Sequence, residues 1–317
     1  GAGPRLVVVD VSNPAAPGDV GTWNFVSAPL SAAIDGASAT VGESQAGLTI
    51  VDLSVSQNPG LSGIFNTIHE VYRIEIEGNL AYAACGRDGL RIVDLSNPAS
   101  PAAVGMFATE GPAIGVSVSG STALVTDGNK LYILNIGNPA NPLLAGEWTA
   151  AGRVFGIALS GARAFVAEGG YGLRILDISN PASPAQLGAL DTPGVASSVA
   201  LAGENAYVAD GRAGLQIVGV ADPANPVPLG SWDTAGIAVD VAAASAKVYL
   251  VDALAGLEIL DVSNPAAPSP IGRSRLPVHA HNVAVSGQRY AVADDQGGLL
   301  VFGGGPSAAR FWRLYEK

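Results

Sequence analysis

A run of five residues that returns at an almost constant interval constrains the fold of this chain more than any other feature. Most copies read Leu-x-Ile/Val-Val/Leu-Asp, and they begin at Leu6, Leu48, Leu90, Leu131, Leu173, Leu215, Leu257 and Leu299. Six of the seven intervals are 42 residues long and one is 41. Self-similarity at a fixed period of this length is the signature of a repeat architecture, in which each period forms one supersecondary unit.

Each period predicts four short β-strands, because four runs of β-branched and apolar residues alternate with turn residues. In the unit around Leu215 the expected strands lie at residues 198–202, 206–209, 215–220 and around 230–232. A four-stranded antiparallel unit of this size is too small to bury both of its faces alone. We therefore predict an all-β fold, a β-propeller in which each unit of about 42 residues is one four-stranded blade.

Composition agrees with this interpretation. The chain has 317 residues, of which 41 are glycine and 21 proline, while only 14% are charged. A helical bundle or coiled coil would need more Glu, Lys and Arg, so a turn-rich β protein is favoured. The first strand of each unit has small residues at alternate positions, such as Ala158 and Ala200, which suits strands that converge near an axis.

The two ends of the chain decide the number of blades. Eight half-blades consist of a third and a fourth strand, whereas only seven consist of a first and a second strand. The half-blade at residues 1–23 has no first and second strand before it in the sequence. We predict a single propeller domain over residues 1–317, with a half-blade at 1–23 and seven further repeats at 24–317, the last one divergent. We favour eight blades, with the tail around Trp312 as an outer strand. In the alternative, a ring of seven, the first half-blade overlaps the last blade and locks it.

The loop after the repeated run carries a family resemblance. The run is followed by Ser-Asn-Pro-Ala-x-Pro at four places, which begin at Ser12, Ser96, Ser179 and Ser263. Run and loop together resemble the LVIVD repeat family over essentially the whole chain. The resemblance implies a propeller on a bacterial or archaeal cell surface, and therefore an extracellular, cell-surface or periplasmic location. Most proteins of that family have no assigned activity, so the resemblance implies little about chemistry.

Charge and hydropathy argue against two classes of partner. Acidic residues outnumber basic residues 27 to 16, which gives a net charge of −11, and such a chain repels the phosphate backbone of a nucleic acid. The longest apolar stretch, residues 236–257, is interrupted by Asp240, Lys247 and Asp252, so we expect no membrane span.

No nucleophile elbow, P-loop or dinucleotide-binding motif occurs. We therefore expect no enzyme, no catalytic residues and no cofactor.

Acidic residues recur at two positions of the repeat. One series precedes the turn between the second and third strands, with Cys85 as the exception: Glu43, Asp127, Glu168, Asp210, Asp252 and Asp294. The other follows the third strand: Asp10, Asp52, Asp94, Asp177 and Asp261. Rings of calcium ligands are one interpretation. We favour carboxylates that accept backbone hydrogen bonds and fix turns, because no dense Asp-x-Asp-x-Asp loop occurs.

Histidine and cysteine give no stronger indication of a metal centre. His279 and His281 lie on one face of an extended segment, which could chelate zinc or copper. His69 lies in a corresponding loop, but in a unit that starts five repeats away, so we expect no metal site. Cys85 lies in a turn with no histidine near it in sequence, and we expect it to be inert.

The start of the first strand is the place where the repeats differ most in chemistry. The equivalent positions are Ser31, Arg73, Gly115, Gly156, Ser198, Asp240 and Asn282, and one unit adds Glu75. Charged residues at small-residue positions near an axis are costly unless they are hydrated or paired. This gives a candidate binding site at the channel mouth, formed by Arg73, Glu75, Asp240, His281 and Asn282. The alternative is a water-filled channel with a tolerant lining, a frequent arrangement that implies no function.

Three functions fit these features. The first, which we favour, is a non-enzymatic cell-surface or extracellular scaffold that binds protein or glycan partners through the propeller rims. The second is an accessory subunit of a larger envelope or extracellular assembly, with aromatic and basic interface anchors in the tail: Arg310, Phe311, Trp312 and Arg313. The third is an enzyme at the channel mouth, either hydrolase- or lyase-like or dependent on a cation.

Overall fold

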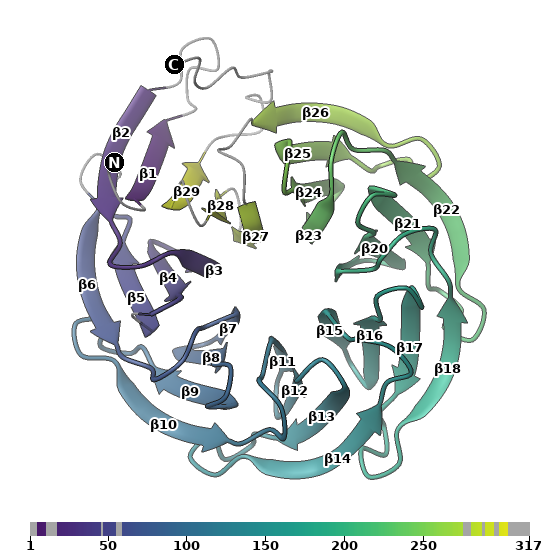
Figure 1. Cartoon of the computed structure of the whole chain (residues 1–317), viewed down its shortest axis with the longest axis horizontal. Coiled ribbons are helices and arrows are strands. Elements are labelled where there is room, and N and C mark those ends of the chain that lie inside the picture. The colour runs from purple at the N-terminus through teal and green to yellow at the C-terminus, as the bar shows by residue number, and fades with distance from the viewer. Residues whose placement is uncertain are drawn as a thin grey trace.

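Seven β-sheets stand radially around a central axis in the computed structural model (Figure 1). The structure describes residues 5–10, 18–45, 47–54, 59–274, 280–286, 289–294 and 298–303. These residues form 29 strands and no helix. The described chain accordingly contains no helix that could cross a membrane.

Each blade is an antiparallel sheet whose strands we name A to D from the axis outward. The A strands are β3 (Pro29–Asp35), β7 (Arg73–Glu77), β11 (Gly115–Ser119), β15 (Gly156–Ser160), β19 (Ser198–Ala202), β23 (Ala238–Ala244) and β27 (Ala280–Ser286). The B strands are β4 (Ser38–Glu43), β8 (Leu80–Ala84), β12 (Thr122–Thr126), β16 (Arg163–Ala167), β20 (Asn205–Ala209), β24 (Lys247–Asp252) and β28 (Arg289–Asp294).

The C strands carry the repeated run and the D strands form the circumference. The C strands are β5 (Gly47–Asp52), β9 (Leu90–Asp94), β13 (Lys130–Asn135), β17 (Leu173–Asp177), β21 (Leu215–Gly219), β25 (Gly256–Asp261) and β29 (Gly298–Gly303). The D strands of the first six blades are β6 (Gly60–Phe65), β10 (Ala102–Phe107), β14 (Leu143–Thr149), β18 (Ala185–Leu190), β22 (Val227–Trp232) and β26 (Ser269–Ser274). Two N-terminal strands remain, β1 (Arg5–Asp10) and β2 (Gly18–Asn24).

The N-terminal half-blade completes the last blade. That sheet has five strands in the order β2-β1-β29-β28-β27. β1 lies parallel to β29 and in register with it, so that Leu6 is opposite Leu299, and β2 pairs with β1 on the outside. Our preference for eight blades was therefore wrong, because residues 5–24 add outer strands to the last sheet and do not begin a sheet of their own. The seven-blade alternative is correct.

The tail was also expected to take part in closing the ring. Residues 304–317 lie outside the described residues, so the interface predicted at Arg310, Phe311, Trp312 and Arg313 stays a prediction, as does the outer strand around Trp312. β1 occupies the edge of β29 at which we had expected the tail strand to pair.

Neighbouring blades meet at the circumference through the proline loops. At Gly230 on β22, a Cβ atom would lie 2.1 Å from the carbonyl oxygen of Pro265 in the C–D loop of the next blade. The same close approach recurs for Gly63 with Pro98, Gly105 with Pro139, Gly146 with Pro181 and Gly188 with Pro223. Only glycine admits this contact, so the glycine of strand D and the proline motif after strand C form one packing device.

The hydrophobic core is divided among the blade interfaces. Leu90 and Ile92 of β9, for example, are fully buried in a cluster that also contains Val116 and Tyr132 of the next blade. Because each sheet packs between two neighbours, both of its faces must carry apolar residues. On β21, Leu215 and Ile217 belong to the core cluster on one side and Val218 to the cluster on the other, and all three are fully buried. The burial of both faces holds the blades in a closed ring.

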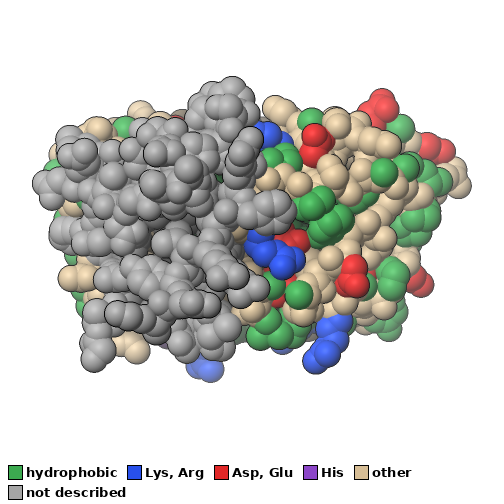
Figure 2. Space-filling model, turned by 90° about the horizontal axis from the view of Figure 1, so that it is seen from above, with side chains coloured by type: hydrophobic (Ala, Val, Ile, Leu, Met, Phe, Trp, Pro, Cys, Tyr) green, Lys and Arg blue, Asp and Glu red, His purple; other side chains and the backbone are tan. Residues whose placement is uncertain are grey.

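The connections divide between two faces of the ring. One face, which we call the D–A face, carries the loops from strand D to strand A and the B–C turns. The other, the C–D face, carries the A–B turns and the C–D loops. Strand A therefore begins at the D–A face. On the flank of the ring, hydrophobic side chains are interspersed with charged ones over the part that is described (Figure 2).

Candidate functional site

Asp240 is the centre of a buried polar cluster at the start of strand A in the sixth blade. Its side chain is 2% exposed. Nη1 of Arg73 donates to both carboxylate oxygens at 3.0 Å. Oγ of Ser198 donates to Oδ1 at 2.6 Å, and Oδ2 accepts from Nδ2 of Asn282 at 2.8 Å and from the backbone N–H of Val283 at 2.9 Å. These hydrogen bonds compensate the desolvation of the carboxylate.

The partners of the ion pair come from opposite sides of the ring. Arg73 begins β7 in the second blade and Asp240 lies on β23 in the sixth, and Figure 1 places these strands on opposite sides of the central axis. Since the N···O distance is 3.0 Å, the guanidinium must reach across the axis. Its side chain is 30% exposed, so water reaches the arginine but hardly the aspartate. The ion pair bridges the channel at the level where the A strands begin.

Asn282 extends the cluster to the junction between the last and first blades. While its Nδ2 donates to Asp240, its Oδ1 accepts the backbone N–H of Ala32 on β3 at 2.8 Å. Ser31, next to Ala32, donates from Oγ to the carbonyl oxygen of Val71 at 3.1 Å, which joins the first blade to the second. Single buried side chains thus connect the A strands around the axis.

Glu75 lies two residues after Arg73 and faces the third blade. Its Oε2 accepts the backbone N–H of Val118 at 2.7 Å. Burial raises the pKa of Glu75 to about 6, although the hydrogen bond from Val118 and the charge of Arg73 act in the opposite direction. Glu77 accepts the N–H of Gly120 at 2.8 Å in the same manner.

One spacing underlies three of these contacts. In each, a carboxylate on an A strand accepts the N–H of the residue 43 positions later: Glu75 with Val118, Glu77 with Gly120 and Asp240 with Val283. Among the described strands none pairs with strand A on the axial side, so some of its backbone N–H groups need another acceptor. Sequence reasoning missed this role. The sequence did carry a signal, because each of these acidic residues lies on strand A, 43 positions before the N–H that it accepts. This spacing is one residue longer than the repeat of 42 residues.

The five residues expected at the channel mouth are only partly brought together. Arg73, Asp240 and Asn282 are joined directly, and Glu75 is near enough to Arg73 for the charge of the arginine to affect its pKa. His281 is exposed: it is the unpaired residue at the register shift of β27 between Ala280 and Asn282, both of which are buried.

The carboxylates that precede the B–C turns hold the D–A loops. In five blades the side chain accepts the backbone N–H of the residue 16 positions earlier: Glu43 with Ser27, Asp127 with Gly111, Glu168 with Gly152, Asp210 with Gly194 and Asp252 with Gly236. Asp127 and Asp252 also accept from N–H groups two and three residues on. The turn-fixing interpretation is therefore correct for those two, and the long-range partner is a further role that we did not foresee.

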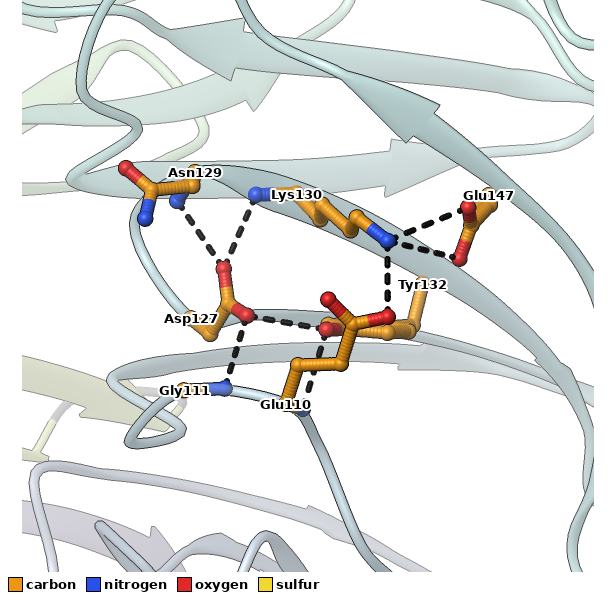
Figure 3. A network of polar contacts seen from close by, with 7 residues as sticks. All are labelled: Glu110, Gly111, Asp127, Asn129, Lys130, Tyr132 and Glu147. Atoms are coloured by element: carbon orange, nitrogen blue, oxygen red, sulfur yellow. Dashed lines mark hydrogen bonds and ion pairs between the residues drawn. The ribbon is translucent and has the colours of Figure 1, made fainter.

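In the third blade this arrangement becomes a network of polar contacts (Figure 3). Asp127 accepts from the hydroxyl of Tyr132 at 2.8 Å and from three backbone N–H groups. Burial alone would raise the pKa of Asp127, but these hydrogen bonds hold it below its ordinary value. Asp210 has hydrogen bonds from Thr192 and Gly194 only, and there burial prevails and raises the pKa.

The carboxylates that follow strand C fix the turn after it, as the sequence predicted. Asp52, Asp94, Asp177 and Asp261 each accept the N–H of the residue two positions later. Asn135, which replaces the aspartate in the third blade, makes the same hydrogen bond with Gly137. The substitution therefore preserves the turn.

No metal centre emerges from the described residues, among which no group of three or more His, Cys, Asp and Glu could hold an ion. His279 lies outside them. Nε2 of His69 lies 3.9 Å from Oδ1 of Asp88. Cys85 is buried, and burial raises the pKa of its thiol to about 12, so the thiol stays protonated at neutral pH.

The two faces of the ring differ in their side chains. Among the residues that the structure describes, seven large hydrophobic ones are exposed on the D–A face: Val26, Ile68, Tyr72, Phe155, Tyr171, Val195 and Leu254. The other seven exposed ones lie on D strands, and none lies in an A–B turn or C–D loop that the structure describes. Among the described side chains, the C–D face carries eight acidic residues and two basic ones: Asp35, Asp52, Glu77, Asp94, Asp177, Glu204, Asp222 and Asp261, with Arg163 and Lys247.

Comparison with known proteins supports the fold. The LVIVD repeat matches residues 2–24, 31–67, 70–109, 110–150, 151–192, 193–234 and 235–274. No curated protein matches the chain. A functionally unknown protein from Desulfotomaculum acetoxidans DSM 771 has a similar structure, with a TM-score of 0.68, 16% identity, and 90% of this chain and 92% of that chain covered.

Two further solved structures are similar. For the β-propeller domain of Cps50 (Swd1) from Myceliophteria thermophila the TM-score is 0.71 at 12% identity, over 87% of this chain and 96% of that one. For BamB from Moraxella catarrhalis the TM-score is 0.59 at 13% identity, over 89% of this chain and 85% of that one. At these identities the likeness concerns the fold alone.

Proposed function

Since the chain belongs to the LVIVD repeat family, we propose that it is a non-enzymatic binding scaffold that holds a protein partner on its D–A face. The observation that carries this proposal is the gathering of exposed hydrophobic side chains on that face. Single exposed apolar residues are normal on any protein. Seven of them on one face of a ring, with none in the described loops and turns of the opposite face, favour an interaction surface.

The channel is a weaker candidate for ligand binding. The carboxylate of Asp240 already receives hydrogen bonds from three side chains and one backbone N–H, and Glu75 binds the backbone of the next blade. These polar groups therefore serve to connect blades. The Arg73–Asp240 pair also crosses the axis at the level where the A strands begin, which leaves less room for a ligand there. This use of the polar groups is our reason for proposing a scaffold in place of an enzyme at the channel mouth.

A protein suits the D–A face better than a glycan does. Val26, Ile68 and Leu254 are aliphatic and largely exposed there, and aliphatic groups are matched by the apolar side chains of another protein. Sugars present mainly hydroxyl groups, whose burial against aliphatic surface would leave hydrogen bonds unmade. We further propose a cell-surface or extracellular location, which rests on the family alone.

Site-specific photo-crosslinking in the cells that make the protein tests the binding face. A photoreactive amino acid replaces Ile68 or Leu254 on the D–A face, and as matched controls Asn97 or Asn264, which are exposed in C–D loops. We expect both D–A positions to give adducts with the same protein, identified by mass spectrometry, and the controls to give none. Adducts at the control positions alone, or none at the D–A positions, would contradict the proposal.

Location is tested separately. Intact cells are treated with a membrane-impermeant amine reagent, and labelling of Lys247 is measured by mass spectrometry. We expect labelling without lysis; labelling that requires lysis would contradict the proposed location.

A further inference from the structure

One sector of the D–A face gathers two aromatic rings, an aliphatic side chain and an arginine. Phe155 lies in the loop before the fourth blade and is 38% exposed, while Tyr171 in the B–C turn of that blade is 46% exposed. Val195, in the loop before the fifth blade, is 50% exposed. Arg153 lies in the same loop as Phe155 and is also exposed. We call these four residues the Phe155 patch.

Glycines bring the members of the patch together. A Cβ atom on Gly152 would lie 2.4 Å from Cδ2 of Tyr171, so the tyrosine ring lies directly against the backbone of the loop that carries Arg153 and Phe155. A Cβ atom on Gly169 would lie 3.2 Å from Cε2 of Phe155. Gly169 also exchanges two backbone hydrogen bonds with Ala196, which places Val195 beside the same turn. The four residues therefore lie around the B–C turn of the fourth blade, at its junction with the fifth.

The two arginines next to the rings differ in their partners. Cζ of Arg174 lies 5.7 Å from the centre of the Tyr171 ring, and this arginine pairs with Glu168 and Asp191 at 3.0 Å each. Cζ of Arg153 lies 5.1 Å from the centre of the Phe155 ring, but Arg153 forms no ion pair within the part of the chain that is described. A partner that covered this patch would bury an uncompensated positive charge unless it brought a negative one.

We propose that the Phe155 patch anchors a segment of a partner protein in which an apolar side chain and a carboxylate lie side by side. The apolar side chain covers Phe155, Tyr171 and Val195, and the carboxylate pairs with Arg153. Aromatic residues and arginine are the residue types that carry most binding energy at protein interfaces. Guanidinium groups already cover one face of each ring, which disfavours the stacking of a sugar. This inference rests on the proposed function, because it assigns an anchor within the same D–A face.

Selection from a phage-displayed library of random dodecapeptides on the full chain tests the anchor. We expect enriched peptides to carry Asp or Glu close to an aliphatic or aromatic residue. The synthetic peptides should lose about tenfold or more in affinity on Phe155→Ala and on Arg153→Gln. Arg87→Gln and Leu254→Ala, at exposed residues in B–C turns of the second and sixth blades, are the matched controls on the same face and should change the affinity less than twofold. Circular dichroism confirms that each variant is folded.

Exchanging the charges of Arg153 and of the acidic residue in the peptide is a more stringent test. Arg153→Glu should abolish binding of the enriched peptide, and a peptide with Lys in place of its acidic residue should bind the Arg153→Glu variant better than the wild type. Affinity that is insensitive to Arg153→Gln, or a library without any binder that depends on Phe155, would overturn the anchor.

The failures of the two proposals are distinguishable. Peptides that lose affinity on Leu254→Ala or Arg87→Gln, but not on the patch variants, overturn the anchor and leave the D–A face as the binding face. Peptides whose affinity is unaffected by every D–A variant, but whose binding is lost on Asn97→Ala or Asn264→Ala, would contradict both proposals. Neutral oligosaccharides that bind in a manner dependent on Tyr171 but not on Arg153 would replace the proposed partner by a glycan.

Discussion

Arg73 and Asp240 are separated by 167 residues in sequence, yet one guanidinium nitrogen donates to both oxygens of the carboxylate at 3.0 Å. The pair joins the second and sixth blades directly, although the first and seventh blades lie between them in the ring (Figure 1). It is therefore a contact that forms only when the ring is complete, and it should contribute to stability in a way that no single blade does.

Removal of the central carboxylate should be costly. Asp240→Ala leaves Arg73 uncompensated and removes the acceptor of Ser198, Asn282 and the Val283 N–H. We expect a loss of about 3 kcal/mol or more in the free energy of unfolding, measured by urea denaturation. Asp177→Ala, in an exposed turn, is the control and should cost much less. Equal losses for the two variants would show that the cluster does not stabilise the ring.

Glu75 predicts a definite dependence of stability on pH. Its pKa is raised from 4.5 to about 6 in the folded chain, so the folded state binds the proton more tightly than the unfolded state does. The contribution of Glu75 to the free energy of unfolding is therefore greatest below about pH 4.5, falls as the pH rises to 6, and then stays lower by about 2 kcal/mol.

The comparison of wild type with Glu75→Gln isolates this contribution. The difference between their free energies of unfolding should change between pH 4.5 and 6 and be constant above pH 7. Glu204→Gln, at an exposed glutamate in an A–B turn, should show no such change. Parallel curves for the wild type and Glu75→Gln over this range would contradict the prediction.

The Asp127 network predicts a measurable role for one hydroxyl. Tyr132 donates to Asp127 and accepts the N–H of Glu110, so Tyr132→Phe removes two hydrogen bonds from a partly buried site. We expect a loss of about 1 to 2 kcal/mol in the free energy of unfolding. Tyr207→Phe is a suitable control, because its hydroxyl makes no hydrogen bond within the described chain. A Tyr132→Phe variant as stable as the control would rule out a structural role for the network.

Closure of the ring predicts an effect of N-terminal deletion. Deletion of residues 1–24 removes β1 and β2 and leaves the edge of β29 without a partner. Because an unpaired strand edge can pair with another chain, we expect self-association and a broad thermal transition, detected by light scattering and calorimetry. A deletion variant that stays monomeric and melts at the wild-type temperature would show that β1 does not close the ring.

The sequence was sufficient to predict the blade. Strands expected at residues 198–202 and 206–209 correspond to β19 at Ser198–Ala202 and β20 at Asn205–Ala209, because turn glycines fix both ends. Gly203 has a φ of +60°, in the left-handed region that favours glycine. The D strand was placed too late, since β22 begins at Val227 and includes Pro228, a residue that usually argues against a strand but is tolerated at an edge.

Contacts between distant repeats were harder to predict. That Arg73 and Asp240 occupy equivalent positions is visible in the sequence, but which positions face each other across the axis depends on the number of blades. The pairing of β1 with β29 was similarly ambiguous, because both strands carry the same motif and either could begin or extend a sheet. The Phe155 patch combines residues from two loops and a turn, and none of them departs from its repeat in a way that marks it.

The ion pair across the axis also depends on the size of the ring. Adding blades to a propeller moves opposite A strands apart, whereas the reach of an arginine side chain is fixed. In a wider ring Arg73 and Asp240 could no longer touch, and each charge would lack its counterpart near the axis. Chains of nearly identical repeats can in principle close into rings with different numbers of blades. In this chain a wider ring would separate the two charges, so the ion pair favours closure at seven blades.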